Sequence, residues 1–81
     1  MAAIAIENTK WTEVAAAGSS GTYQVMSGGQ VHILKQDSDP GDDVLTGLSY
    51  RNGEGDSFDT TGVWARLPVT GQGAAGSVEV T

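Results

Sequence analysis

Glycine punctuation is the feature that most constrains how this chain can fold. Its 12 glycines, in only 81 residues, form neither a collagen-like period nor one low-complexity block. They fall between short segments that are rich in β-branched and aromatic residues. Such regular alternation of short apolar segments with turn residues is typical of a β-sandwich or a β-barrel. We therefore expect an all-β protein, a small antiparallel β-sandwich or barrel.

Several short segments have the composition of strands, and some of them alternate polar and apolar residues with a period of two. Val31 and Ile33, for example, are expected to share one face of a strand. A helix over residues 7–17 is the minority interpretation, because Thr9 and Thr12 are poor interior helix residues. The expected strands are residues 4–6, 10–14, 22–26, 30–35, 44–50, 57–59, 63–67 and 77–80.

Two of the expected turns follow from the residues at their corners. Pro40 followed by Gly41 suits the two central positions of a type II turn. Asn52 followed by Gly53 suits the pair of positive φ angles of a tight hairpin turn. We expect both segments simply to reverse the chain.

The size and charge of the chain limit its organisation and its partners. We expect one domain, residues 1–81, whose first residues 1–9 are flexible or contact a partner. The core of so short a chain is thin and the sequence has no cysteine, so oligomerisation is the expected source of extra stability. A formal net charge of −6 opposes binding to nucleic acid and to anionic membranes. We predict a homo-oligomer that binds neither nucleic acid nor a membrane.

Catalytic patterns are not found in the sequence. The single histidine, His32, lies in the middle of an expected strand, and there is no nucleophile-elbow motif. The glycines do not have the spacing of a phosphate-binding loop, and a chain of this size barely forms the cleft that glycoside hydrolysis needs. We predict a non-enzymatic protein with no catalytic residue and no cofactor, and a small hydrolase is the least favoured alternative.

The acidic segment 37–43 leaves calcium binding open. Its spacing departs from that of an EF-hand loop, because Leu48 stands where a bidentate glutamate is needed. We favour an exposed loop that holds no essential ion, and we predict no metal site. The carboxylates in question are those of Asp37, Asp39, Asp42 and Asp43.

Contacts with partners are expected to involve aromatic and apolar residues of the strands. Trp11, Tyr50 and Trp64 would form a platform for sugars if they were exposed together, whereas in a thin sandwich most aromatic residues belong to the core. An unpaired strand at either end of the chain would accept a strand from another chain. The candidate interface or surface residues are Ile4, Ile6, Trp11, Tyr50, Trp64, Arg66, Val78 and Val80.

Four segments carry a resemblance to a known group of proteins: Trp11-Thr12-Glu13-Val14, Ser27-Gly28-Gly29-Gln30-Val31-His32-Ile33, Gly62-Val63-Trp64-Ala65-Arg66 and Ser77-Val78-Glu79-Val80. Through them the chain resembles small bacteriophage virion structural proteins, which are head-decoration or fibre-associated β modules. The resemblance implies a capsid decoration or cement protein, made in the host cytoplasm and located in the virion. It also implies a homotrimer that binds the major capsid protein or another virion protein and stabilises the shell. The alternatives are a head- or tail-fibre module that contacts the host and a small carbohydrate-binding domain.

Overall fold

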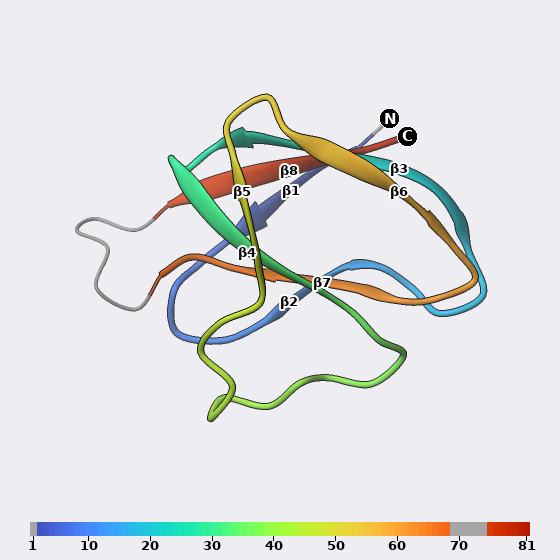
Figure 1. Cartoon of the computed structure of the whole chain (residues 1–81), viewed down its shortest axis with the longest axis horizontal. Coiled ribbons are helices and arrows are strands. Elements are labelled where there is room, and N and C mark those ends of the chain that lie inside the picture. Colours follow the sequence, from blue (N-terminus) through green and yellow to red (C-terminus); the bar gives the residue numbers. More distant parts are fainter. Residues whose placement is uncertain (1, 69–74) are drawn as a thin grey trace.

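The computed structural model describes residues 2–68 and 75–81, which form strands and loops (Figure 1). None of these residues belongs to a helix, so the described chain has no helix that could cross a membrane. Each segment expected to be a strand overlaps an observed one, and the minority helix over residues 7–17 does not form. The strands are β1 (Ala2–Ile6), β2 (Thr12–Ala15), β3 (Ser20–Ser27), β4 (Gln30–Lys35), β5 (Leu48–Arg51), β6 (Gly55–Asp59), β7 (Val63–Arg66) and β8 (Gly76–Val80).

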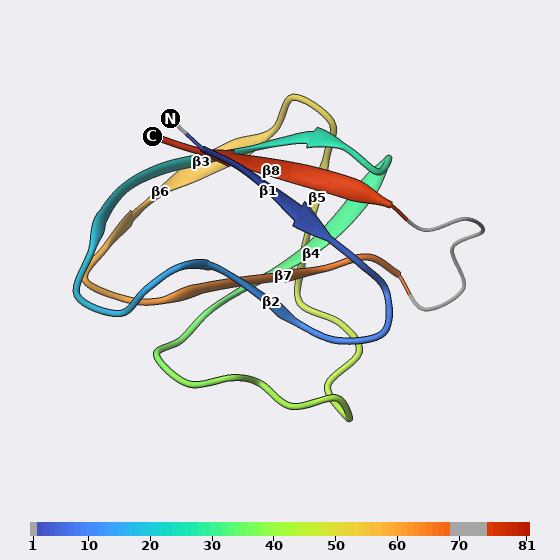
Figure 2. The ribbon, with the colours of Figure 1, turned by 180° about the vertical axis from the view of Figure 1, so that it is seen from behind.

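The strands pair in a nested order. The antiparallel pairs are β1 with β8, β2 with β7, β3 with β6 and β4 with β5. Pairing of β3 with β8 and of β4 with β7 then joins them into two four-stranded sheets, sheet A (β1-β8-β3-β6) and sheet B (β2-β7-β4-β5). This is the strand order of a jelly roll, in which one long antiparallel hairpin is rolled into two facing sheets. The expected antiparallel β-sandwich is therefore confirmed, and β1 and β8 run side by side in sheet A (Figure 2).

Inward-facing side chains of both sheets form the core. Val25 and Val78 of sheet A are 0% exposed, as are Val31, Ile33 and Val63 of sheet B. Val31 and Ile33 share the buried face of β4, as the period-two pattern predicts. The residues between them along each strand point to the outer face of their sheet, where their burial depends on what covers that face.

Three aromatic rings complete the core beside β5 and β6. The ring of Tyr23 meets that of Tyr50 edge-on, with the centroids 5.6 Å apart, and stacks on that of Phe58 at 6.4 Å. The Tyr23 hydroxyl donates a hydrogen bond of 2.9 Å to the Tyr50 hydroxyl. Burial, reinforced by this hydrogen bond, raises the pKa of the Tyr23 phenol. Tyr50 is therefore engaged inside the sandwich.

The two expected turns have different outcomes. Gly41 has a φ of +94°, as the second corner residue of a type II turn requires. The predicted hairpin turn is wrong, because Gly53 has a positive φ of +89° but Asn52 does not. The turn is closed by a 2.9 Å hydrogen bond from the Glu54 amide to the Arg51 carbonyl, and it carries the chain from β5 in sheet B to β6 in sheet A. A two-residue hairpin would have kept both strands in one sheet.

Two segments near strand ends differ from the expectation. The strand expected over residues 44–50 is paired only from Leu48 onward, and residues 44–47 belong to the preceding loop. There the backbone of Gly47 passes so close to β4 that an added Cβ would lie 2.6 Å from the Ile33 carbonyl oxygen. Within the segment expected to be flexible or partner-bound, residues 2–6 form β1 and pair with β8.

An ion pair links the two sheets beside the aromatic cluster, and it makes stability depend on pH. Lys35 Nζ lies 3.0 Å from Asp56 Oδ2 and donates a second hydrogen bond to the Ser57 carbonyl. The hydrogen bond from Lys35, with smaller contributions from the Ser57 amide and the lysine charge, lowers the pKa of Asp56. A carboxyl whose pKa is lower in the folded state stabilises the fold above its ordinary pKa, and this stabilisation is lost as the pH falls through the folded value.

We expect Asp56→Asn to weaken the loss of stability on acidification. The asparagine cannot be protonated in this range, so the contribution of the Lys35 pair is already missing at neutral pH. Denaturant unfolding measured at a series of pH values from neutral to acid checks this, with Asp43→Asn as a matched loss of one exposed carboxylate. Parallel stability curves for the unaltered chain and Asp56→Asn would contradict the prediction.

Candidate functional site, an anchored surface loop

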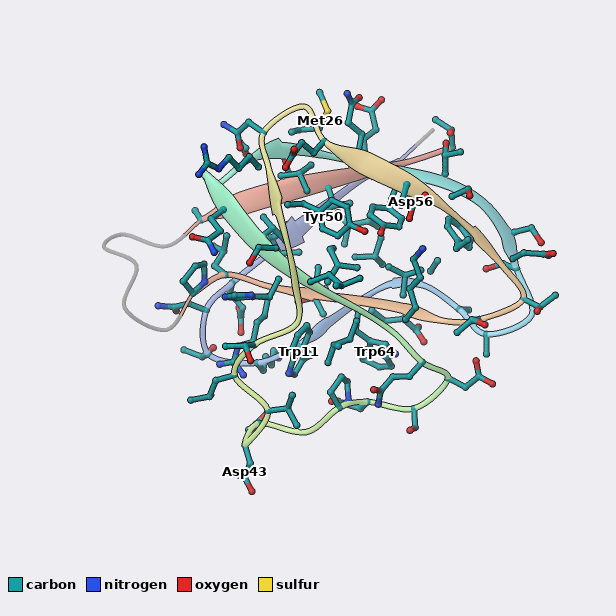
Figure 3. The ribbon with its side chains drawn as sticks, viewed as in Figure 1. Trp11, Met26, Asp43, Tyr50, Asp56 and Trp64 are labelled. Carbon is teal, nitrogen blue, oxygen red and sulfur yellow. The ribbon has the colours of Figure 1, made fainter. Side chains whose placement is uncertain are left out.

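Residues 36–47, which connect β4 to β5, form a long loop that folds over the outer face of sheet B (Figures 1 and 3). We call these residues the anchored loop. Connections of this length without secondary structure are uncommon in small domains and are frequently functional. Such a loop is fixed only when other parts of the protein satisfy its backbone groups. The side chains that do so here come from the outer face of sheet B and from the segment before β2.

Both tryptophans hold the anchored loop through their indole nitrogens. Trp11, just before β2, is 3% exposed and donates a 2.7 Å hydrogen bond from Nε1 to the Val44 carbonyl. Trp64 points to the outer face of β7, opposite to Val63 and Ala65, and its Nε1 donates to the Gln36 carbonyl at 3.0 Å. Figure 3 shows both rings between the sandwich and the loop. One indole therefore fixes the start of the loop, and the other fixes its far part.

Arg66 is the most deeply buried of the anchoring residues. Its side chain is 1% exposed, and its guanidinium carbon lies 5.9 Å from the centre of the Trp11 ring. Nη2 donates to the Asn8 carbonyl at 2.6 Å, and Nη1 donates to the carbonyls of Val44 at 3.2 Å and Asp42 at 3.4 Å. Nε has no partner within residues 2–68 and 75–81, an arrangement that costs about 1–3 kcal/mol for a buried polar group. One buried cation thus binds three carbonyls of two backbone segments, the anchored loop and the Asn8 segment, without a carboxylate.

His32 and Asp37 complete the attachment. His32 is the cross-strand neighbour of Arg66 between β4 and β7, and it is 8% exposed. Its Nδ1 accepts a long hydrogen bond, 3.4 Å, from the amide of Gly47 at the end of the loop. Asp37 accepts a hydrogen bond of 3.1 Å from the Gly62 amide near the start of the loop. The single histidine therefore lies on the outer face of β4, beneath the loop, where it helps to hold the loop in place.

The side chains that the anchored loop turns outward are of two kinds. Val44 and Leu45 are 37% and 44% exposed, and Leu48, the first residue of β5, is 60% exposed. Of the described residues, Met26 is the one other large apolar side chain in this class, at 46%. Asp42 and Asp43 are also exposed, and Figure 3 shows Asp43 pointing away from the sandwich at the tip of the loop. A rigid backbone therefore presents acidic and apolar groups together.

The eight candidate interface residues do not form one surface in the structure. The structure brings Trp11, Trp64 and Arg66 together beneath the anchored loop. Ile6 and Val78 lie in the core, with Val80 packed against it, and Tyr50 faces Tyr23. Ile4 is half-buried on β1, an edge strand of sheet A. The segment at the carboxyl end, β8, lies between β1 and β3 and so has no free edge.

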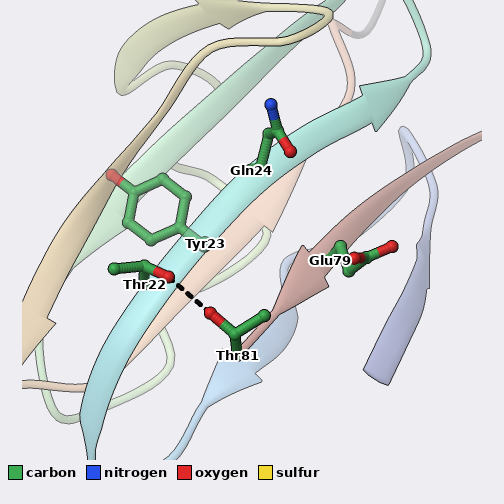
Figure 4. A pocket seen from close by; sticks show the side chains of 5 residues that line it. All are labelled: Thr22, Tyr23, Gln24, Glu79 and Thr81. Atoms are coloured by element: carbon green, nitrogen blue, oxygen red, sulfur yellow. Dashed lines mark hydrogen bonds between the residues drawn. The ribbon is translucent and has the colours of Figure 1, made fainter. Parts of the chain in front are cut away.

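The rest of the described surface has neither a pocket of the usual size for a small molecule nor a cluster of metal ligands. A hollow of about 170 Å³ on sheet A is lined by Thr22, Tyr23, Gln24, Glu79 and Thr81 (Figure 4). Its volume is below the roughly 300–1,000 Å³ of typical small-molecule pockets. Within residues 2–68 and 75–81, no three His, Asp or Glu side chains gather as a metal site requires. Asp39 of the acidic segment instead accepts the Gly41 amide at 2.8 Å, within its own turn.

The sequence analysis did not identify Val44 and Leu45 as candidate contact residues, and it did not predict that His32 anchors a loop. The sequence places His32, Trp64 and Arg66 at positions that alternate with core residues, but such residues suit an exposed strand face as well as a covered one, so this pattern alone does not reveal the loop above them. Comparison with known proteins assigns no family to the chain: no family model matches it, and no curated protein and no solved structure matches it.

Proposed function

We propose that this chain is a non-enzymatic structural protein of a bacteriophage virion, most specifically a capsid decoration protein that stabilises the shell by contact with the major capsid protein. The observation that supports this function is the anchored loop. Two tryptophans, a buried arginine and a histidine fix its backbone, while Asp42, Asp43, Val44 and Leu45 face outward. Contact proteins gain affinity from surfaces that are rigid before binding, because less conformational entropy is lost in the complex.

The fold supports the same proposal by analogy. Jelly rolls with two four-stranded sheets recur in viral capsid domains, and also in lectins and cupins. The same fold carries different functions in different proteins, so the anchored loop is the feature that favours a contact protein. The lectin alternative is less favoured, because Trp11 and Tyr50 are engaged beneath the loop and inside the sandwich and cannot stack on a sugar without rearrangement.

We further propose that the protein acts as a homo-oligomer, most specifically a trimer. The outer edge of β1 supports self-association, because its residues Ala2–Ile6 include no charged residue and no proline. The other edge strands are protected by charges: Glu13 on β2, Arg51 on β5, and Asp56 and Asp59 on β6. An uncharged edge is also where copies of an acidic chain repel each other least. Closed symmetric assembly is the usual form of such contacts.

Purified particles test the proposed function directly. We expect the protein to co-purify with virions in a copy number comparable to that of the capsid protein, and light scattering of the free protein to give the mass of a trimer. A copy number of only a few per particle would favour the fibre module instead. A stable monomer that is absent from particles would contradict the proposal.

A further inference from the structure

The tip of the anchored loop, residues 42–45, has a composition that selects its partner. Asp42 and Asp43 make no side-chain hydrogen bond or ion pair with any residue of the described chain. Directly after them, Val44 and Leu45 expose apolar surface. Three of the four large apolar side chains exposed in the described chain lie between residues 44 and 48. Charge and apolar area therefore coincide in a few consecutive residues.

The same tip is held in place before any contact is made. The carbonyls of Asp42 and Val44 both accept hydrogen bonds from Arg66, and that of Val44 also accepts one from Trp11. The backbone positions on either side of Asp43 are thus fixed from below. A tip that is rigid before contact presents its side chains in one arrangement, which is how a small surface becomes selective.

We propose that this tip docks on a basic protein surface: an apolar depression that receives Val44 and Leu45, bordered by lysine or arginine side chains that pair with Asp42 and Asp43. This inference rests on the proposed function, and it names the chemistry of the capsid surface that the protein contacts. Opposite charges at the rim of a contact accelerate association and exclude partners of like charge. A second copy of the chain is an unsuitable occupant, because its net charge is also −6 and its own tip is acidic.

Binding of the fluorescently labelled protein to virions stripped of it tests this inference, with Kd measured at low and at high salt. We expect the affinity of the unaltered protein to fall with added salt. Asp43→Asn should weaken binding at low salt by about threefold to tenfold and reduce the salt dependence, because a rim charge acts mainly on the association rate. Leu45→Ser should weaken binding by about tenfold while the salt dependence stays the same.

Matched variants on other surfaces are the controls. Glu79→Gln removes one negative charge from β8 in sheet A, and Met26→Ser removes an apolar side chain that is 46% exposed, compared with 44% for Leu45. Both controls should bind like the unaltered protein, and circular dichroism should show all four variants folded. The inference would be wrong if the tip variants and their controls bound equally well, or if the affinity did not change with salt concentration. Neither result would contradict the proposed function.

Two further outcomes distinguish a second copy of the chain from a capsid surface as the partner of the tip, and the proposed function from the inference about the tip. If Leu45→Ser changes the oligomer to a monomer in light scattering, the tip is a contact between copies of the chain and the inference is wrong. If the unaltered protein fails to bind the stripped virions at any salt concentration, the proposed function and the inference built on it are both refuted.

Discussion

Replacement of Trp11 by alanine is expected to lower the free energy of unfolding by about 3–5 kcal/mol, the usual cost of truncating a large buried aromatic side chain. Trp11 is 3% exposed, so removal of the indole leaves a cavity or exposes to water the groups that packed against it. The substitution also removes the hydrogen-bond donor to the Val44 carbonyl and the ring beneath the Arg66 guanidinium. Denaturant unfolding followed by far-ultraviolet circular dichroism measures the loss.

Trp64, the less buried of the two anchoring tryptophans, is the comparison for Trp11. Its ring is only half-buried on the outer face of β7, so Trp64→Ala should cost about 1–3 kcal/mol, in line with the smaller apolar area removed from water. Trp11→Phe retains a buried ring but loses the indole donor, and we expect it to cost about 1 kcal/mol from the hydrogen bond alone. A Trp64→Ala variant as unstable as Trp11→Ala would contradict the ranking by burial, and a Trp11→Ala variant with an unchanged melting temperature would show that Trp11 does not anchor the loop.

The sandwich could be predicted from the sequence because local rules decide it. Alternation in β4 put Val31 and Ile33 on one face, and glycines marked most strand ends. The strand pairing was not accessible in the same way, since which edges meet depends on the whole chain. The sequence offers the strands at both ends of the chain as edges that another chain could pair with, but β8 has neighbours on both sides and only β1 of the two lies at an edge. Asn52-Gly53 was misassigned for the same reason, because a turn within a sheet and a turn between sheets have similar residues.

The anchored loop shows a second limit of sequence reasoning. The groups that hold it are side chains, but most of the groups that they hold are backbone carbonyls, of Asn8, Gln36, Asp42 and Val44. Every residue has a carbonyl, so these acceptors leave no trace in the sequence. The sequence therefore predicts a surface or interface position for Arg66, although it is among the most buried residues of the described chain. A large polar side chain at an outward strand position indicates either an exposed contact or a covered face, and only the fold separates the two.

Arg66→Met is the second substitution with a large expected effect. Removal of the guanidinium eliminates a buried charge and an Nε that has no partner in the described part of the chain, which by itself would stabilise the fold. The opposing effect is larger, because the guanidinium loses its hydrogen bonds to the carbonyls of Asn8 and Asp42, and a hydrogen bond that involves a charged group contributes about 1.5–3 kcal/mol. The Val44 carbonyl retains the Trp11 indole as a donor. We therefore expect a net loss of about 2–5 kcal/mol in the free energy of unfolding, measured by denaturant titration.

The location of this loss distinguishes anchoring from a general weakening of the core. Arg66 holds the loop and the Asn8 segment, so limited proteolysis of Arg66→Met should cut between residues 36 and 47 well before the sandwich unfolds. Arg66→Lys should behave similarly, because one ammonium cannot match the fork of donors that reaches three carbonyls. Arg51→Met makes the same change on the exposed edge strand β5, and there we expect less than about 0.5 kcal/mol. If Arg66→Met is cut no faster in the loop than Arg51→Met, the loop keeps its position without the buried arginine, and anchoring by Arg66 is refuted.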